Sequence, residues 1–126
     1  MYKTHVIQLR NLSNSQFDLL KKYCWHSARL YNSALFLVRK HYKLTSKYLS
    51  YYDVQRLLKT NIHFQYLTTA IAQQILIKLD ENYKTFFALI NKYKGTTTKV
   101  RSPKYLDKKD MFSLFILMVF NLKTTN

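Results

Sequence analysis

Cysteine, glycine and proline each occur only once in this chain of 126 residues. The single cysteine, Cys24, excludes a disulfide within the chain and a zinc site built from thiolates. It lies beside Trp25 inside a predicted helix, so we expect a small buried hydrophobe rather than a reactive thiol. One glycine and one proline argue against a β-rich fold, which needs many tight turns.

Acidic residues are also scarce, because 6 Asp and Glu stand against 21 Lys and Arg. A two-metal nuclease site needs several converging carboxylates, and most of these acids are better explained as helix-start residues or counter-charges. No two of the 4 histidines have the four-residue spacing of a helical metal site. The sequence also contains no glycine-rich phosphate loop and no nucleophile elbow. We therefore predict no catalytic residue, no metal, no cofactor and no small-molecule substrate.

What the chain has in excess is positive charge, a formal net charge of +15, interleaved with 11 Tyr and 8 Phe. Such a charge destabilises a compact chain through self-repulsion unless an anionic partner offsets it. Nucleic acid is the expected partner, because each neutralised phosphate releases a counterion and aromatic rings offer stacking faces to unpaired bases. A solvated basic surface around an aromatic core is the alternative.

The spacing of apolar residues predicts a mainly α-helical fold. Apolar positions recur at three- and four-residue steps from Phe17 to Tyr42, which is typical of an amphipathic helix. We expect this helix to begin at Ser15, with Asp18 in the capping position, and to end near His41.

Two further helices are predicted after this one. Ser50 and Asp53 repeat the cap spacing and begin a short helix with Val54, Leu57 and Leu58 facing inward. Residues 60–65 are expected to be a connection, and a third helix with a long apolar stripe begins at Thr68 or Thr69. Three amphipathic helices with short connections predict a three-helix bundle.

The ends of the chain differ from this helical part. Residues 2–10 alternate with a period of two, which predicts an N-terminal β-strand. Residues 93–110 form a basic connector that holds the only glycine and the only proline, and a disordered linker and a phosphate-tracking arm are its two interpretations. We therefore divide the chain into a strand plus helical recognition domain at 1–92, this connector at 93–110, and a tail at 111–126.

The tail is nearly all apolar from 111 to 122 and is shorter than the about 20 residues of a membrane-spanning helix. It either pairs as a short C-terminal strand with the N-terminal strand, inserts shallowly in a membrane, or marks a truncated or frameshifted end; we prefer pairing. The first residues lack the apolar core of a secretory signal, so we expect a cytoplasmic protein, associated with the nucleoid if it binds DNA.

Five segments then suggest a relationship. They are YKTHVIQLR at 2–10, RLYNSAL at 29–35, LSYYDVQRLLK at 49–59, AIAQQILIKLDENYKTFF at 70–87 and VRSPKYLDKKDMFSLF at 100–115. In this order and with these spacings, the chain resembles the N-terminal region of the TnpB/OrfB family, which are transposon-encoded RNA-guided nucleases.

The resemblance implies a layout and a function. The first strand would belong to a small wedge barrel, the helices would form an inserted recognition lobe of the helix-turn-helix kind, and a short strand near 112–115 would return to the barrel. In that family the region cradles guide RNA and the guide–target duplex, while base pairing supplies sequence specificity. The nuclease domain of the family lies further along, so this chain is expected to be a binding fragment without nuclease activity.

Basic and aromatic residues concentrate at the end of the first helix and the start of the second. Together with the connector, they give the predicted contacts to guide-type RNA or DNA: Arg10, Arg29, Asn32, Arg39, Lys40, Lys43, Tyr51, Arg56, Lys99, Arg101, Lys104, Lys108 and Lys109. Two alternatives stay open. One is a membrane-surface protein that places the connector on anionic lipid and inserts the tail, and the other is a complete metal-dependent nuclease.

Overall fold

The computed structural model describes residues 13–107 of the chain, and these residues form four helices and no strand. The helices are α1 (Asn14–Thr45), α2 (Tyr51–Leu58), α3 (Ile62–Tyr66) and α4 (Thr69–Lys92). The mainly helical prediction is therefore confirmed. The predicted strand at 2–10, the tail at 111–126 and three predicted contact residues lie outside the described residues: Arg10, Lys108 and Lys109.

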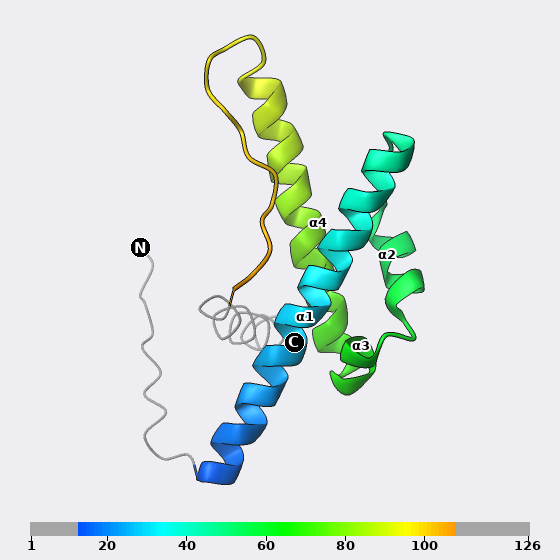
Figure 1. Cartoon of the computed structure of the whole chain (residues 1–126), viewed down its shortest axis with the longest axis vertical. Coiled ribbons are helices and arrows are strands. Elements are labelled where there is room, and N and C mark those ends of the chain that lie inside the picture. Colours follow the sequence, from blue (N-terminus) through cyan, green and yellow to red (C-terminus); the bar gives the residue numbers. More distant parts are fainter. Residues whose placement is uncertain (1–12, 108–126) are drawn as a thin grey trace.

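The two long helices, α1 and α4, cross each other and diverge toward their C-terminal ends, while α2 and α3 lie together on one side of α1 (Figure 1). Fully buried aliphatic side chains fill the crossing: Leu30, Ala34, Leu35 and Val38 from α1, and Ala72, Ile75, Leu76 and Leu79 from α4. Truncating one of these leucines to alanine typically costs about 2–5 kcal/mol, because a cavity is left behind. This crossing is therefore the centre of the core.

The first helix is longer than predicted at both ends. Its N-cap is Ser13, whose hydroxyl accepts from the Gln16 amide at 3.2 Å while the Gln16 side chain accepts from the Ser13 amide at 3.0 Å. The expected cap at Ser15 was wrong, because this reciprocal box satisfies two free amides one half-turn earlier. At the other end the helix continues to Thr45, and Ser46 stops it in the left-handed conformation at φ 58°.

Between α2 and α4 the prediction of a plain connection was also wrong. Asn61 accepts from the His63 amide at 2.8 Å and so begins the short helix α3. Phe64 is buried and anchors this helix to the core. The starts of the neighbouring helices are confirmed, since Ser50 and Thr68 are their N-caps, but Leu57 is 55% exposed and does not face inward.

Cys24 is buried, as predicted from the sequence. Burial raises the pKa of its thiol from 9.0 to about 11, because the thiolate loses hydration. The thiol is therefore protonated at neutral pH and packs as a small apolar group.

A pair of histidines joins α1 to α3. The Nδ1 atoms of His26 and His63 lie 2.9 Å apart, so one ring donates and the other accepts. Tyr66 stacks on His26 with ring centroids 3.8 Å apart. Burial, followed by the charge of Lys22, lowers the pKa of His26, and burial, His26 and Arg29 lower the pKa of His63. The folded chain therefore favours the neutral pair.

We predict that this pair makes the fold less stable in mild acid. Unfolded histidines take up protons near pH 6.5, whereas the folded pair takes them up at lower pH, so acidification favours unfolding. The contribution of the pair to the free energy of unfolding is complete above pH 6.5, and it decreases as the pH falls from 6.5 toward the pKa values of the folded pair. The measurement is the urea concentration at the midpoint of unfolding, taken at about pH 7.5 and at about pH 5.5. This midpoint should change less between the two pH values in His63→Gln than in the wild type.

His41→Gln is the matched control, since His41 lies on the same helix about four turns beyond His26. This control should keep the wild-type difference between the two midpoints. An undiminished difference in His63→Gln would show that the pair does not respond to pH.

Candidate nucleic-acid interface

The basic connector does not leave the helices as a free linker. After α4 it runs back along the molecule to the middle of α1 (Figure 1). There the Asn32 amide donates to the Leu106 carbonyl at 3.1 Å and accepts from the Leu106 amide at 2.8 Å. Arg39 donates to the carbonyl of Pro103, and its guanidinium lies 4.7 Å from the centroid of the Tyr105 ring. These contacts hold residues 103–106 against α1.

Three predicted contact residues therefore have roles within the fold. Asn32 and Arg39 donate hydrogen bonds to the carbonyls of Leu106 and Pro103, respectively. Tyr51 packs against the core. A guanidinium has five donors, so the bond to Pro103 leaves others for a ligand. Asn32 and Tyr51 have less to offer, because the Asn32 amide bonds through both its oxygen and its nitrogen and the Tyr51 ring is partly buried.

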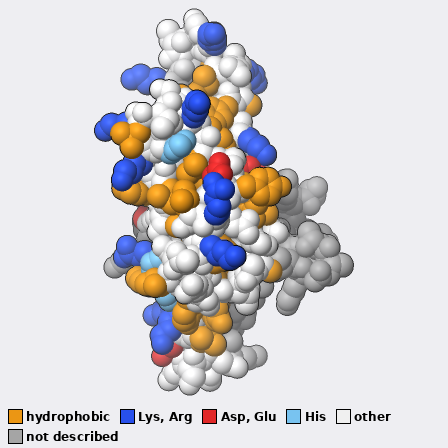
Figure 2. Space-filling model, turned by 90° about the vertical axis from the view of Figure 1, so that its right-hand side faces the viewer, with side chains coloured by type: hydrophobic (Ala, Val, Ile, Leu, Met, Phe, Trp, Pro, Cys, Tyr) orange, Lys and Arg blue, Asp and Glu red, His pale blue; other side chains and the backbone are white. Residues whose placement is uncertain are grey.

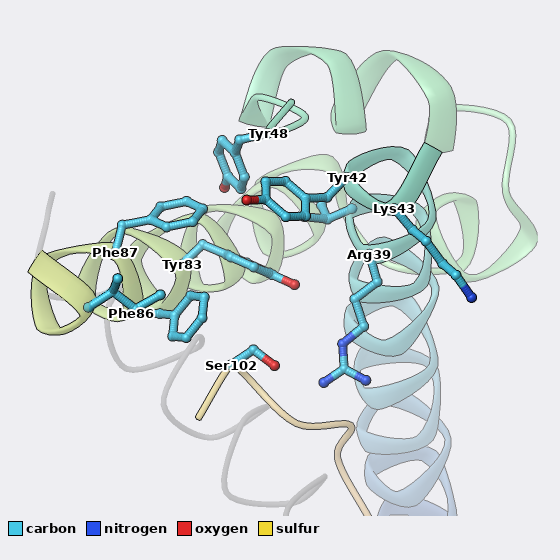
Figure 3. Close-up of a pocket in the computed structure, with 10 residues that line it drawn as sticks. Arg39, Tyr42, Lys43, Tyr48, Tyr83, Phe86, Phe87 and Ser102 are labelled. Carbon is cyan, nitrogen blue, oxygen red and sulfur yellow. The ribbon is translucent and has the colours of Figure 1, made fainter. Parts of the chain in front are cut away.

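Where α1 and α4 diverge, a cleft of about 560 Å³ opens between their C-terminal halves (Figure 3). We call it the aromatic cleft, lined by Val38, Arg39, Tyr42, Lys43, Tyr48, Tyr83, Phe86, Phe87, Ile90 and Ser102. One wall is a cluster of aromatic rings in contact. The ring centroid of Tyr48 lies 5.4 Å from those of Tyr83 and Phe87, and the centroids of Phe86 and Phe87 lie 5.5 Å apart. The volume is in the range of small-ligand sites.

The hydroxyls of Tyr48 and Tyr83, two of the polar groups that line this cleft, are held by neighbouring polar side chains. The Tyr48 hydroxyl donates to Asp80 at 2.6 Å, and the same carboxylate pairs with Lys84 at 3.0 Å. Burial, then the bond to Asp80, raises the pKa of Tyr48. Burial likewise raises the pKa of Tyr83, against the opposing effect of Arg39. The cleft therefore offers ring faces and hydroxyls rather than an acid or a nucleophile.

A second feature is a row of alternating rings and cations along α1, which we call the α1 stripe: Phe17, Lys21, Trp25, Arg29, Phe36 and Lys40. In each pair the cation stands over the ring four residues before it, at 4.8 Å for Lys21, 5.1 Å for Arg29 and 6.0 Å for Lys40. At 100° per residue these positions fall within about 140° of the helix circumference and span about 35 Å. The stripe is exposed, with Trp25 at 42% and Phe36 at 53%.

The other predicted basic residues are exposed but differ in their surroundings. Arg56 pairs with Asp53 at 2.8 Å, which offsets its charge. Lys43 lies in the last turn of α1, where it complements the helix dipole. Lys99, Arg101 and Lys104 of the connector are exposed. Basic side chains also spread along the face of the molecule that carries α2, with few acidic ones among them (Figure 2).

Most aromatic members of the stripe and the cleft were not predicted as contacts, although aromatic residues were expected among the basic ones at the end of the first helix and the start of the second. Trp25, Phe36, Phe86 and Phe87 were not among the predicted contacts. The signal for the stripe is present in the sequence as aromatic–basic pairs at four-residue spacing. No comparable signal exists for the cleft, because it is formed between helices that are distant in sequence: Tyr42 and Tyr83, for example, are 41 residues apart.

Within residues 13–107, no three His, Cys, Asp or Glu side chains gather in a way that could hold a metal ion. None of the helices in this part of the chain is both long enough and apolar enough to cross a membrane. Comparison of the chain with family models, curated proteins and solved structures found no match.

We predict that Asn32→Ala releases the connector without unfolding the helices. Losing a buried hydrogen-bonding partner costs about 1–3 kcal/mol, which weakens the seat of Leu106 while the α1–α4 core keeps its side chains. Limited trypsin digestion should then cut after Lys104 faster than in the wild type, with unchanged helical circular dichroism. Ser33→Ala, next to Asn32 on α1, is the control and should be cut at the wild-type rate. Equal rates in all three proteins would mean that the Asn32 bonds do not hold the connector.

Proposed function

We propose that this chain is the nucleic-acid-binding N-terminal part of a TnpB-like protein, and that it contacts the backbone of RNA or DNA without cutting it. The observation that carries the binding role is the α1 stripe. Rings and cations alternate on one exposed face, and this combination serves single-stranded nucleic acid by pairing phosphates with cations and bases with rings.

The charges of this stripe are available for phosphates. Among the ion pairs of residues 13–107, the acids are taken by Arg56 and Lys84, and Arg29 and Lys40 belong to neither pair. The only acid of α1 is Asp18, near its N-terminal end. A local explanation exists, because cation–ring pairs at four-residue spacing also stabilise an isolated helix. It does not explain why the whole chain carries +15, and an anionic partner does.

The link to the TnpB/OrfB family rests on the segments quoted above, and within the described residues three of these segments bond to one another. Asn82, in the segment 70–87, donates to the Tyr31 hydroxyl of the segment 29–35 at 2.8 Å. Asn32 of that same segment pins Leu106 of the segment 100–115. Three segments that resemble one family in sequence order are thus connected in space, which supports treating them as parts of a single inherited module.

Binding should be electrostatic, and it should depend on particular charges rather than on net charge. With about six phosphates neutralised, the plot of log K against log salt should have a slope of about −4 to −5. The double variant Arg29→Gln/Lys40→Gln should reduce the magnitude of this slope by about 1.4–1.8, since two phosphate contacts are lost. Fluorescence anisotropy with an RNA hairpin and a DNA duplex of equal length measures both slopes.

The matched control is Arg56→Gln/Lys84→Gln, which removes the same charge from residues that are paired with acids. Its slope should stay closer to that of the wild type. Equal slopes for the two double variants would mean that net charge alone governs binding and that the stripe is not the contact surface. Absence of salt-dependent binding in the wild type would refute the proposed function.

A further inference from the structure

We propose that the aromatic cleft receives an unpaired nucleobase from a single-stranded segment, and that Tyr42 closes over this base against the rings of α4. This inference rests on the proposed function and adds to the exposed contacts along α1 a base held inside a cleft. It assigns a role to a part of the surface that the α1 stripe does not reach.

Four of the rings around the cleft form one wall, and the ring of Tyr42 stands apart from them. Tyr48, Tyr83, Phe86 and Phe87 contact one another. Tyr42 is 52% exposed, points into the cleft in Figure 3, and makes no ring contact among the described residues. A flat ligand inserted between Tyr42 and this wall would gain stacking on both sides, and aromatic rings favour such offset contacts.

The positive charges around the cleft favour a flat ligand that also carries negative charge. Arg39 and Lys43 border it, and Ser102 adds a hydroxyl from the connector. The connector that supplies Ser102 also carries the exposed side chains of Arg101 and Lys104. None of the described residues that line the cleft is acidic. A base attached to phosphates matches this combination of rings inside and cations outside, whereas a neutral apolar ligand would gain nothing from the positive charge at the rim.

The geometry also selects an unpaired base. A base inside a duplex is already stacked on its neighbours, so moving it into a pocket costs a few kcal/mol of unstacking. A base in a flexible single strand has an open face and enters at less cost. The cleft should therefore distinguish single strands from duplexes, although the α1 stripe can meet the phosphates of both.

The test compares Tyr42→Leu with Tyr42→Phe in the full chain. Leucine removes the ring and keeps apolar bulk, whereas phenylalanine keeps the ring and removes the hydroxyl. Stacking is worth about 1–3 kcal/mol per base, so Tyr42→Leu should weaken binding to a single strand of about 12 thymidylates by about 5- to 150-fold. Tyr42→Phe should bind within about two-fold of the wild type. Tyr52→Leu, on a 79% exposed tyrosine of α2 outside the cleft, is the matched control and should have no effect.

An abasic strand of the same length and a DNA duplex serve as further probes. The proposal requires that Tyr42→Leu leaves binding to both unchanged, because neither offers an unpaired base. Equal weakening for all three probes would overturn it, since the effect would then be structural or electrostatic. Thymidylate binding unchanged by Tyr42→Leu would also overturn it, and the proposed function would still stand if Arg29→Gln/Lys40→Gln weakens binding. Failure of the wild type to bind any probe would overturn both.

Discussion

The crossing of α1 and α4 is the contact on which the rest of the structure depends. Its buried aliphatic side chains make the core continuous, and alanines at 34 and 72 are completely buried within it. Small residues allow helices to approach closely, and two straight helices that cross at an angle must separate on either side of the contact. The aromatic cleft is the space left where they separate, so the same packing that stabilises the fold also creates the concave site.

Polar bonds between distant segments fix the details that apolar packing leaves free. Tyr48 to Asp80, Asn82 to Tyr31 and Asn32 to Leu106 each join residues 32 or more positions apart in sequence. They are partly buried, so breaking any one leaves a polar group poorly satisfied. They also occupy the few acids and amides of the interior, and the many cations remain on the surface. The charge imbalance of the sequence thus becomes an outward-facing property of the molecule.

The sequence predicted the helical class, the caps at Ser50 and Thr68 and the burial of Cys24, because these depend on local spacing and side-chain chemistry. It failed where two local signals competed or where tertiary contacts decided. Ser13 and Ser15 are both plausible caps, and the pattern Ser13-x-x-Gln16 matches the capping box better than Ser15-x-x-Asp18, so this error could have been avoided from the sequence. The short helix α3 is stabilised by the packing of Phe64 into the core, which is a tertiary contact. The position of the connector depends on the hydrogen bonds between Asn32 and Leu106, which are 74 residues apart in sequence. The predicted contacts were mostly cations, with Tyr51 as the one aromatic residue, and they did not include the stripe rings Trp25 and Phe36.

The central claim is that nucleic acid lies along α1, from the stripe to the aromatic cleft. Photocrosslinking of a single-stranded RNA containing 4-thiouridine, followed by mass spectrometry of the peptides, tests it most directly. The account predicts crosslinks to the α1 peptides that contain Trp25, Phe36 and Tyr42. Crosslinks confined to α2 and α3, for example at the exposed Tyr52, would contradict it.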